Sequence, residues 1–343
     1  MQQVSLTDPT WTTSEPNAFH RASLVFINDV RDTPFLKLIA TLLLTVVPSG
    51  VFMIVSGFRW WHAAVHLVLV FWFLGPYILM LHNTSHRKLF KKKWERLNHF
   101  IPWFLGPFFG ETPDTYFAHH VGMHHPENNM EEDLSSTLPY RRDSVRGFVR
   151  YFLRFFFGVI VELPRYFLRK NRRSLVVKSL AGELLFFAVT GALAYFTDWR
   201  AVVAVLVVPY VSTRFLMMCG NWGQHAFVDE AAPENCYRNS ITCINTGYNR
   251  RCFNDGYHIG HHVKQTRHWT EMPEDFTKNL ATYAKEGAVV FDGIDFFIVW
   301  MFLMLKRYDW LARRYVKLDG AEKSEAEIIE LLQSRTRWTR AAA

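Results

Sequence analysis

The sequence predicts an all-α integral membrane protein that has four transmembrane helices in two hairpins, surface-lying amphipathic helices and a cytosolic histidine-rich cap. Half of the 343 residues are hydrophobic although 20% are charged, so the apolar residues must be concentrated in blocks. Four blocks approach the length of about 20 residues that crosses the hydrocarbon core of a bilayer. Most of the histidines lie at the ends of the hairpins and in the polar segments that follow them.

Each predicted hairpin consists of two apolar runs joined by a short turn. The runs extend over residues 35–58 and 63–81 in the first hairpin and over 175–196 and 201–219 in the second. A hairpin returns the chain to the side from which it started, so the polar segments after both hairpins emerge on one face. The basic segment Arg87–Arg96 lies on this face, and positive charge beside a membrane segment marks the cytoplasmic side. We therefore expect the histidine-rich segments and both termini to be cytoplasmic.

The membrane domain is expected to cover residues 34–306, between a polar N-terminal lead-in (1–33) and a cytosolic C-terminal helical tail (307–343). Within the membrane domain, residues 100–110 are apolar but too short to cross a bilayer, and residues 288–305 are better suited to a surface-lying helix. Residues 147–170 alternate aromatic residues and arginines, which is typical of an amphipathic helix in the headgroup region. Glu183 and Arg214 lie inside predicted spans, where facing the helix bundle costs less than facing lipid.

The net charge of +8 is compatible with binding to nucleic acid or to an anionic membrane surface. The apolar blocks favour the membrane, and we expect no nucleic-acid partner. The four cysteines show no CxxC spacing, which favours ordinary reduced thiols over a zinc site or disulfides. The N-terminus has no basic run followed by an apolar run, so we expect no cleaved signal peptide.

Ten of the fifteen histidines gather in three clusters and one accessory motif. Imidazole is the commonest metal ligand in proteins, and histidines at positions i and i+4 share one face of a helix. Each short match alone is weak evidence, but three clusters in order on one membrane face predict a metal centre. The members are His82 and His86; His119, His120, His124 and His125; His258, His261 and His262; and His225 with Asn221.

Nine imidazoles exceed what one zinc ion needs and suit a pair of ions with open coordination positions. Imidazole ligation alone leaves iron, zinc, copper and nickel open. The carboxylate of Asp255 could orient a metal-binding imidazole by a hydrogen bond, without binding the metal itself. His62 and His66 show the same spacing, but His66 lies about 24 Å from His82 along a helix and is interpreted as a packing or interfacial histidine.

The order HxxxH, HxxxHH and HxxHH around two hairpins resembles the membrane fatty acid desaturase family over about residues 35–305. Asn221 and His225 match the additional Asn-His element of its acyl-CoA desaturases. The first motif is not the HxxxxH of animal stearoyl-CoA desaturases, and the HPGG of a fused cytochrome b5 domain is absent from the sequence. The resemblance implies the metal ligands His82, His86, His120, His124, His125, His225, His258, His261 and His262, with Asn221 as an outer ligand and His119 as the alternative to His120.

The resemblance further implies two iron ions (Fe2+/Fe3+), O2 as co-substrate and a long acyl chain, carried by CoA or by a lipid, as substrate. Introduction of a double bond is the first hypothesis, and hydroxylation by a membrane monooxygenase of the same superfamily is the alternative. A non-enzymatic metal-binding membrane protein is a third reading. Electrons would come from a separate ferredoxin or cytochrome b5. The residues Lys91–Lys93, Arg141, Arg142 and Arg173 could hold a phosphate-bearing head group, or could simply mark the cytoplasmic face.

Overall fold

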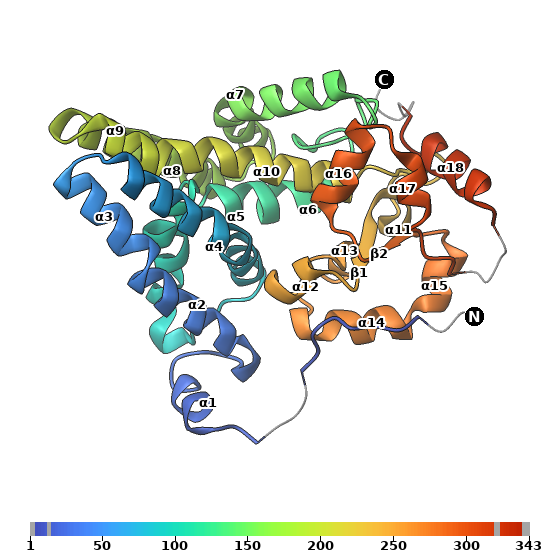
Figure 1. The fold of residues 1–343 in the computed structure, drawn as a ribbon, viewed down its shortest axis with the longest axis horizontal. Coiled ribbons are helices and arrows are strands. Elements are labelled where there is room, and N and C mark those ends of the chain that lie inside the picture. The colour runs from blue at the N-terminus through green and yellow to red at the C-terminus, as the bar shows by residue number, and fades with distance from the viewer. Residues whose placement is uncertain (1–3, 12–14, 319–322, 338–343) are drawn as a thin grey trace. The chain divides into compact units, whose positions relative to one another are not determined.

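The computed structural model describes residues 4–11, 15–318 and 323–337, and it is mostly helical (Figure 1). The chain forms two compact units, which are described separately. Unit 1 contains residues 1–11, 123–159 and 216–343, and unit 2 contains residues 12–122 and 160–215. The prediction of a mainly helical protein is confirmed.

Four helical stretches of the described chain are long and apolar enough to cross a membrane. They are Val30–Ser56, Trp60–His86, Arg173–Phe196 and Trp199–Gln224. All lie in unit 2 except for the last turns of the fourth, which belong to unit 1. Each overlaps one predicted apolar run, so the prediction of four candidate spans is confirmed. Their arrangement as two hairpins across a bilayer stays a prediction.

Prolines explain why two of the stretches are not continuous α-helices. The first consists of η1 (Val30–Asp32), α2 (Thr33–Leu44) and α3 (Val46–Ser56). The break at Thr45 follows Leu44, whose carbonyl would clash with the ring of Pro48 four residues later. The fourth consists of α9 (Trp199–Val202), a π-helical turn η6 (Val203–Val207) and α10 (Val208–Gln224). The π-helical turn lies where the ring of Pro209 would meet the carbonyl of Val205.

The other two stretches are the single helices α4 (Trp60–His86) and α8 (Arg173–Phe196). In Figure 1, α2 and α3 lead into α4 at the blue end of the chain. The turn after α3 contacts the turn after α8, because the backbone N–H of Phe58 donates to Oδ2 of Asp198 at 3.0 Å. This hydrogen bond joins the connections of both helix pairs within unit 2.

A short irregular segment lies against the fourth stretch in unit 2. It comprises η3 (Ile101–Leu105) and η4 (Gly106–Phe109) and ends at Gly110, which has a φ of +75°. A Cβ at Gly110 would lie 2.3 Å from the carbonyl carbon of Pro209, so only glycine fits this approach. Thr213 Oγ1 donates to the carbonyl of Phe109 at 2.7 Å. The segment is thus fixed directly to α10.

Glu183 and Arg214 meet inside unit 2. Their Oε1 and Nη2 atoms lie 2.5 Å apart, and both side chains are buried. Thr112 Oγ1 donates to the same Oε1 at 2.9 Å, and the Arg214 guanidinium lies 4.3 Å from the ring centroid of Tyr210. The expectation that these charges avoid lipid is therefore met by direct pairing.

The amphipathic helix predicted over residues 147–170 is α7 (Val145–Arg169). Exposed apolar side chains recur along it at every fourth position, at Val145, Val149, Leu153, Phe157 and Val161. This spacing places them on one face of the helix. The location of that face in a membrane surface stays a prediction.

Unit 1 contains two short strands that the sequence did not predict. Strand β1 (Ile241–Ile244) pairs in parallel with β2 (Val289–Asp292), with Ile241 opposite Val289, and the two lie side by side in Figure 1. The prediction of a helix over residues 288–305 is therefore wrong for β2. The helix there, α16 (Phe296–Met304), begins only after Asp295, whose carboxylate accepts from the N–H of Ile298.

The helix expected in the C-terminal tail is α18 (Glu325–Ser334), and residues 319–322 lie outside the described residues. A capping box between Ser324 and Glu327 begins the helix.

At the other end of the chain, Asp8 is buried in unit 1, where its Oδ2 accepts from the hydroxyl of Tyr257 at 2.7 Å and from the N–H of Asn245 at 2.8 Å. Part of the predicted N-terminal lead-in thus contacts the residue before His258.

The remaining helices are short. They are α1 (Ala18–Ser23), η2 (Lys92–His99), α5 (Thr115–His119), η5 (His120–His124), α6 (His125–Glu127), α11 (Cys236–Asn239), α12 (Gly247–Arg251), α13 (His258–Val263), η7 (Trp269–Glu271), α14 (Met272–Lys278), α15 (Leu280–Lys285) and α17 (Tyr308–Ala312).

Candidate metal centre

The predicted ligands come from the ends of long helices and from short helical turns. His82 and His86 end α4, His225 follows α10, and the third cluster forms α13. The second cluster runs through η5 into α6, and the boundary between the units falls within it, after Gly122. His82, His86 and His120 therefore belong to unit 2, and the other predicted ligands belong to unit 1.

Four histidines of unit 1 converge on one point. One ring nitrogen of each lies within 4.8 Å of the corresponding nitrogen of all the others, and all four side chains are buried. The Nε2 atoms of His225 and His258 are 3.2 Å apart. We call this set, His124, His225, His258 and His262, the four-histidine group.

Hydrogen bonds on the far side of three rings determine which nitrogen faces the centre. Nδ1 of His124 lies 2.7 Å from Oδ2 of Asp133, and Nδ1 of His225 lies 2.9 Å from the carbonyl oxygen of Asn239. Nδ1 of His262 lies 3.1 Å from Oδ1 of Asn128. A carboxylate, a peptide carbonyl and an amide oxygen accept hydrogen bonds, so each Nδ1 carries the proton and donates. The Nε2 atoms are left with lone pairs, which is the form that binds a metal.

Burial keeps two members of the group, His225 and His258, in the neutral form. Desolvation, helped by the neighbouring His124, lowers the pKa of His225 to about 3. Burial and the surrounding imidazoles also hold the pKa of His258 well below its ordinary value. The converging Nε2 lone pairs of His124, His225 and His262 form an electron-rich pocket. The residues present therefore fit a metal cation.

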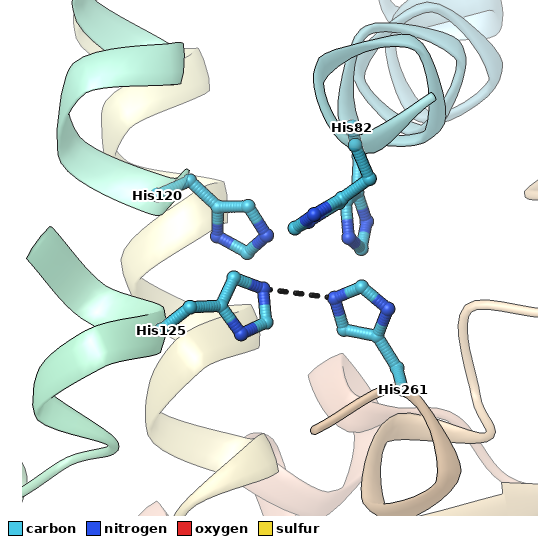
Figure 2. A group of neighbouring side chains, drawn as sticks. His82, His120, His125 and His261 are labelled. Atoms are coloured by element: carbon cyan, nitrogen blue, oxygen red, sulfur yellow. Dashed lines mark hydrogen bonds between the residues drawn. The ribbon is translucent and has the colours of Figure 1, made fainter. Parts of the chain in front are cut away.

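His125 and His261 form a second pair within unit 1. Their Nε2 atoms lie 2.9 Å apart, as the dashed line in Figure 2 shows. Two nitrogens that bind one ion at right angles, each about 2.1 Å away, would be separated by about 3.0 Å. The spacing of this pair is compatible with shared ligation of one ion.

Three histidines cluster in unit 2. The ring centroids of His82 and His120 lie 4.6 Å apart, and that of His86 lies 5.1 Å from His120 and 5.2 Å from His82 (Figure 2 labels His82 and His120). The ring of Tyr116 stacks on His120 at a centroid distance of 5.2 Å. Of the two alternatives left open in the second cluster, it is therefore His120 that joins His82 and His86.

The amide of Asn221 is oriented by two contacts. Its Nδ2 donates to the carbonyl of Ser135 at 3.0 Å and to the hydroxyl oxygen of Tyr151 at 2.7 Å. Both amide hydrogens are then used, so Oδ1 is the atom that can face a metal or a bound water. The role of Asn221 as an outer ligand stays a prediction.

A carboxylate that the sequence did not single out orients one of the imidazoles. Asp133 holds His124, and its carboxylate also accepts from the N–H groups of Asn129 and Ser135. Asp255, the predicted candidate, accepts from the hydroxyl of Tyr248 at 2.7 Å. Asp133 lies at the end of an acidic run, nine residues after His124. In the sequence, Asp133 is marked only by its place in this acidic run, and that does not distinguish its carboxylate from those of its neighbours.

The prediction that Arg142 holds a head group is wrong. Its side chain is fully buried, and its guanidinium donates to peptide carbonyls. The neighbouring Arg141 is largely exposed and pairs with Asp143 at 2.6 Å. The sequence places the two arginines side by side and cannot tell which of them is buried.

His62 and His66 are packing histidines, as interpreted. Both are buried in unit 2, and Ser49 Oγ lies 3.1 Å from Nε2 of His62 and 3.2 Å from Nδ1 of His66. The hydroxyl of Ser49 thereby connects α3 to α4. These histidines belong to the helix pair and not to the metal centre.

The described chain combines four helices that are apolar enough to cross a membrane with histidine groups that could hold metal. The family model described as fatty acid desaturase matches residues 58–293, which is more than half of the chain. The chain therefore belongs to the fatty acid desaturase family, which supports a desaturase- or hydroxylase-type oxidoreductase function in a membrane. Neither the curated proteins nor the solved structures include a significant match to the chain.

Proposed function

We propose that this protein is a fatty acid desaturase that introduces a double bond into a long acyl chain, carried by CoA or by a lipid, with O2 as oxidant. The observation that carries the proposal is the four-histidine group, in which at least three Nε2 lone pairs are fixed toward one point. The family supplies the reaction type.

Two iron ions are proposed as the cofactor. The four-histidine group would hold one ion. The family resemblance implies further histidine ligands for the second ion. When bound, the iron pair would supply an O2-derived oxidant strong enough to take hydrogen from an unactivated C–H bond. The residues of the chain present neutral imidazoles, and Asp133, Asn128 and the carbonyl of Asn239 hold three of the rings in place.

Desaturation removes two hydrogen atoms from the acyl chain and reduces O2 to two waters, which requires two further electrons and two protons. A separate electron carrier of the ferredoxin or cytochrome b5 type is proposed as the electron source. The protein is proposed to keep both termini and the histidine clusters on the cytoplasmic side, where such carriers are available. Hydroxylation is the alternative outcome, because transfer of oxygen after the first hydrogen abstraction gives an alcohol.

Expression in a heterologous host, followed by analysis of its fatty acids, tests the proposal. We expect the wild-type chain to produce a new unsaturated fatty acid, and the variants His125→Ala and His261→Ala to produce none while they remain in the membrane fraction. A hydroxylated lipid without a new double bond would contradict desaturation. Retention of product by either histidine variant would contradict the proposed site.

A further inference from the structure

Arg142 is a buried cation in unit 1 whose partners are all peptide carbonyls. No carboxylate among the described residues pairs with it directly, and its side chain has no exposed surface. Burial lowers its pKa only to about 10, so it remains charged at neutral pH. A buried charge is tolerated only when its hydrogen-bonding groups are satisfied.

The five N–H groups of its guanidinium match five carbonyls. Nε donates to Ala226 at 2.9 Å, and Nη1 donates to Tyr140 at 3.2 Å and to Thr137 at 3.5 Å. Nη2 donates to Arg335 at 3.0 Å and to Arg337 at 2.5 Å. The segment after α18 therefore satisfies two of the five donors.

The same guanidinium contacts Ala226 and Thr137, which are linked to two members of the four-histidine group. Ala226 directly follows His225, and the hydroxyl of Thr137 donates to the carbonyl of His225 at 2.7 Å. The N–H of Thr137 donates to Oδ1 of Asn129 at 2.8 Å. The N–H of Asn129 in turn donates to Oδ2 of Asp133, the partner of His124, at 2.9 Å. Arg142 thus connects to two of the four histidines.

Further contacts fix the segment after α18 to unit 1. The N–H groups of Arg142 and Val228 donate to the carbonyls of Thr336 and Arg335 at 2.9 and 3.0 Å. The buried Thr336 also lies within hydrogen-bond distance of Tyr308, with 2.8 Å between the hydroxyl oxygens. These contacts hold the segment where its carbonyls accept from Arg142.

We propose that the segment Arg335–Arg337 is a positioning element of the metal centre, which acts through Arg142 on His225 and His124. The inference rests on the proposed function, because it requires that the four-histidine group binds a metal. It assigns to a distant part of the chain the task of keeping two imidazoles in place. Removing the segment takes away the carbonyls that two of the guanidinium donors contact, and we expect the guanidinium, with the carbonyls of Thr137 and Ala226, to shift.

The test compares iron retention in full-length and altered chains, purified in detergent. Three variants are compared with the wild type. The first is a shortened chain that ends at Ser334. The second is Arg142→Lys, which keeps the charge but lacks the planar five-donor group, and the third is Thr336→Val, which removes only the hydroxyl that contacts Tyr308. Arg313→Gln is the matched control, because Arg313 is an exposed arginine of the same unit that pairs with Glu325 of α18. The readouts are iron per chain, the rate of iron loss to a chelator, and the thermal unfolding of the iron-free proteins.

We expect the shortened chain and Arg142→Lys to lose iron about 10-fold faster or more, in line with other residues that orient ligands. We expect a smaller increase for Thr336→Val and none for Arg313→Gln. Equal rates in the wild type and all variants would overturn the inference while leaving the proposed function intact. Faster loss that merely follows lowered unfolding temperatures of the iron-free proteins would also overturn it. If the shortened chain does not fold, the rate of iron loss from Thr336→Val tests the inference in its place. A wild-type chain that binds no metal would instead overturn the proposed function.

Discussion

Nδ1 of His124 donates to Oδ2 of Asp133 across 2.7 Å, and both side chains are buried. This contact fixes the ring of one proposed metal ligand and raises the electron density on its Nε2. Further contacts to Asp133, from the N–H groups of Asn129 and Ser135 and from the hydroxyl of Ser135, fix the carboxylate itself.

We predict that Asp133→Asn weakens iron binding by about 10- to 100-fold, because the amide keeps an acceptor but loses the negative charge. Iron affinity in a chelator competition is the measurement. Glu131→Gln is the control, since Glu131 lies in the same acidic run and is exposed. Equal affinities in the two variants would show that Asp133 has no role in ligation.

Because Glu183 and Arg214 form a buried ion pair, we expect the single and double variants of this pair to differ in their free energy of unfolding. Arg214→Leu leaves the Glu183 carboxylate buried without its partner, which typically costs about 3–5 kcal/mol. We expect the double variant Glu183→Leu, Arg214→Leu to regain most of this free energy of unfolding. Chemical denaturation in detergent measures the three values. A double variant that is no more stable than Arg214→Leu would mean that the two charges do not depend on each other.

The burial of Glu111 leads us to expect that the stability of the protein depends on pH. This residue is buried in unit 2, and no hydrogen-bond partner of its Oε1 is found among the described residues. Burial raises its pKa from 4.5 to about 8, although the Arg214 charge opposes the shift. The folded state therefore holds a proton that the unfolded state releases, so the contribution of Glu111 to stability falls as the pH rises from about 4.5 to about 8.

We expect the unfolding temperature of the wild type to decrease more between pH 5.5 and pH 8 than that of Glu111→Gln, whose amide does not titrate. Differential scanning fluorimetry in detergent at the two pH values compares them. An identical decrease in both proteins would show that Glu111 titrates normally.

The candidate spans and the histidine groups could be predicted because they depend on local patterns. Apolar runs of sufficient length mark the helices, and histidine spacing marks the clusters. The break at Thr45 is also local in origin, since Pro48 disfavours a helical hydrogen bond to Leu44.

What could not be predicted depends on residues that are distant in sequence. The strands β1 and β2 are four residues each and pair across more than forty intervening residues, and nothing in either apolar run indicates the partner. Similarly, Arg142 and Arg141 look alike in sequence, and burial of the former depends on carbonyls from Ala226, Arg335 and Arg337. Such partners become visible only when the fold is known.

The most direct test of the account measures iron and product together in the wild type and in His258→Ala. His258 belongs to the four-histidine group, and its side chain is buried. We predict about two irons per chain and a new unsaturated fatty acid for the wild type, with loss of iron and of the product in the variant. A His258→Ala protein that keeps its iron and forms the same product at the wild-type rate would contradict the proposed metal centre.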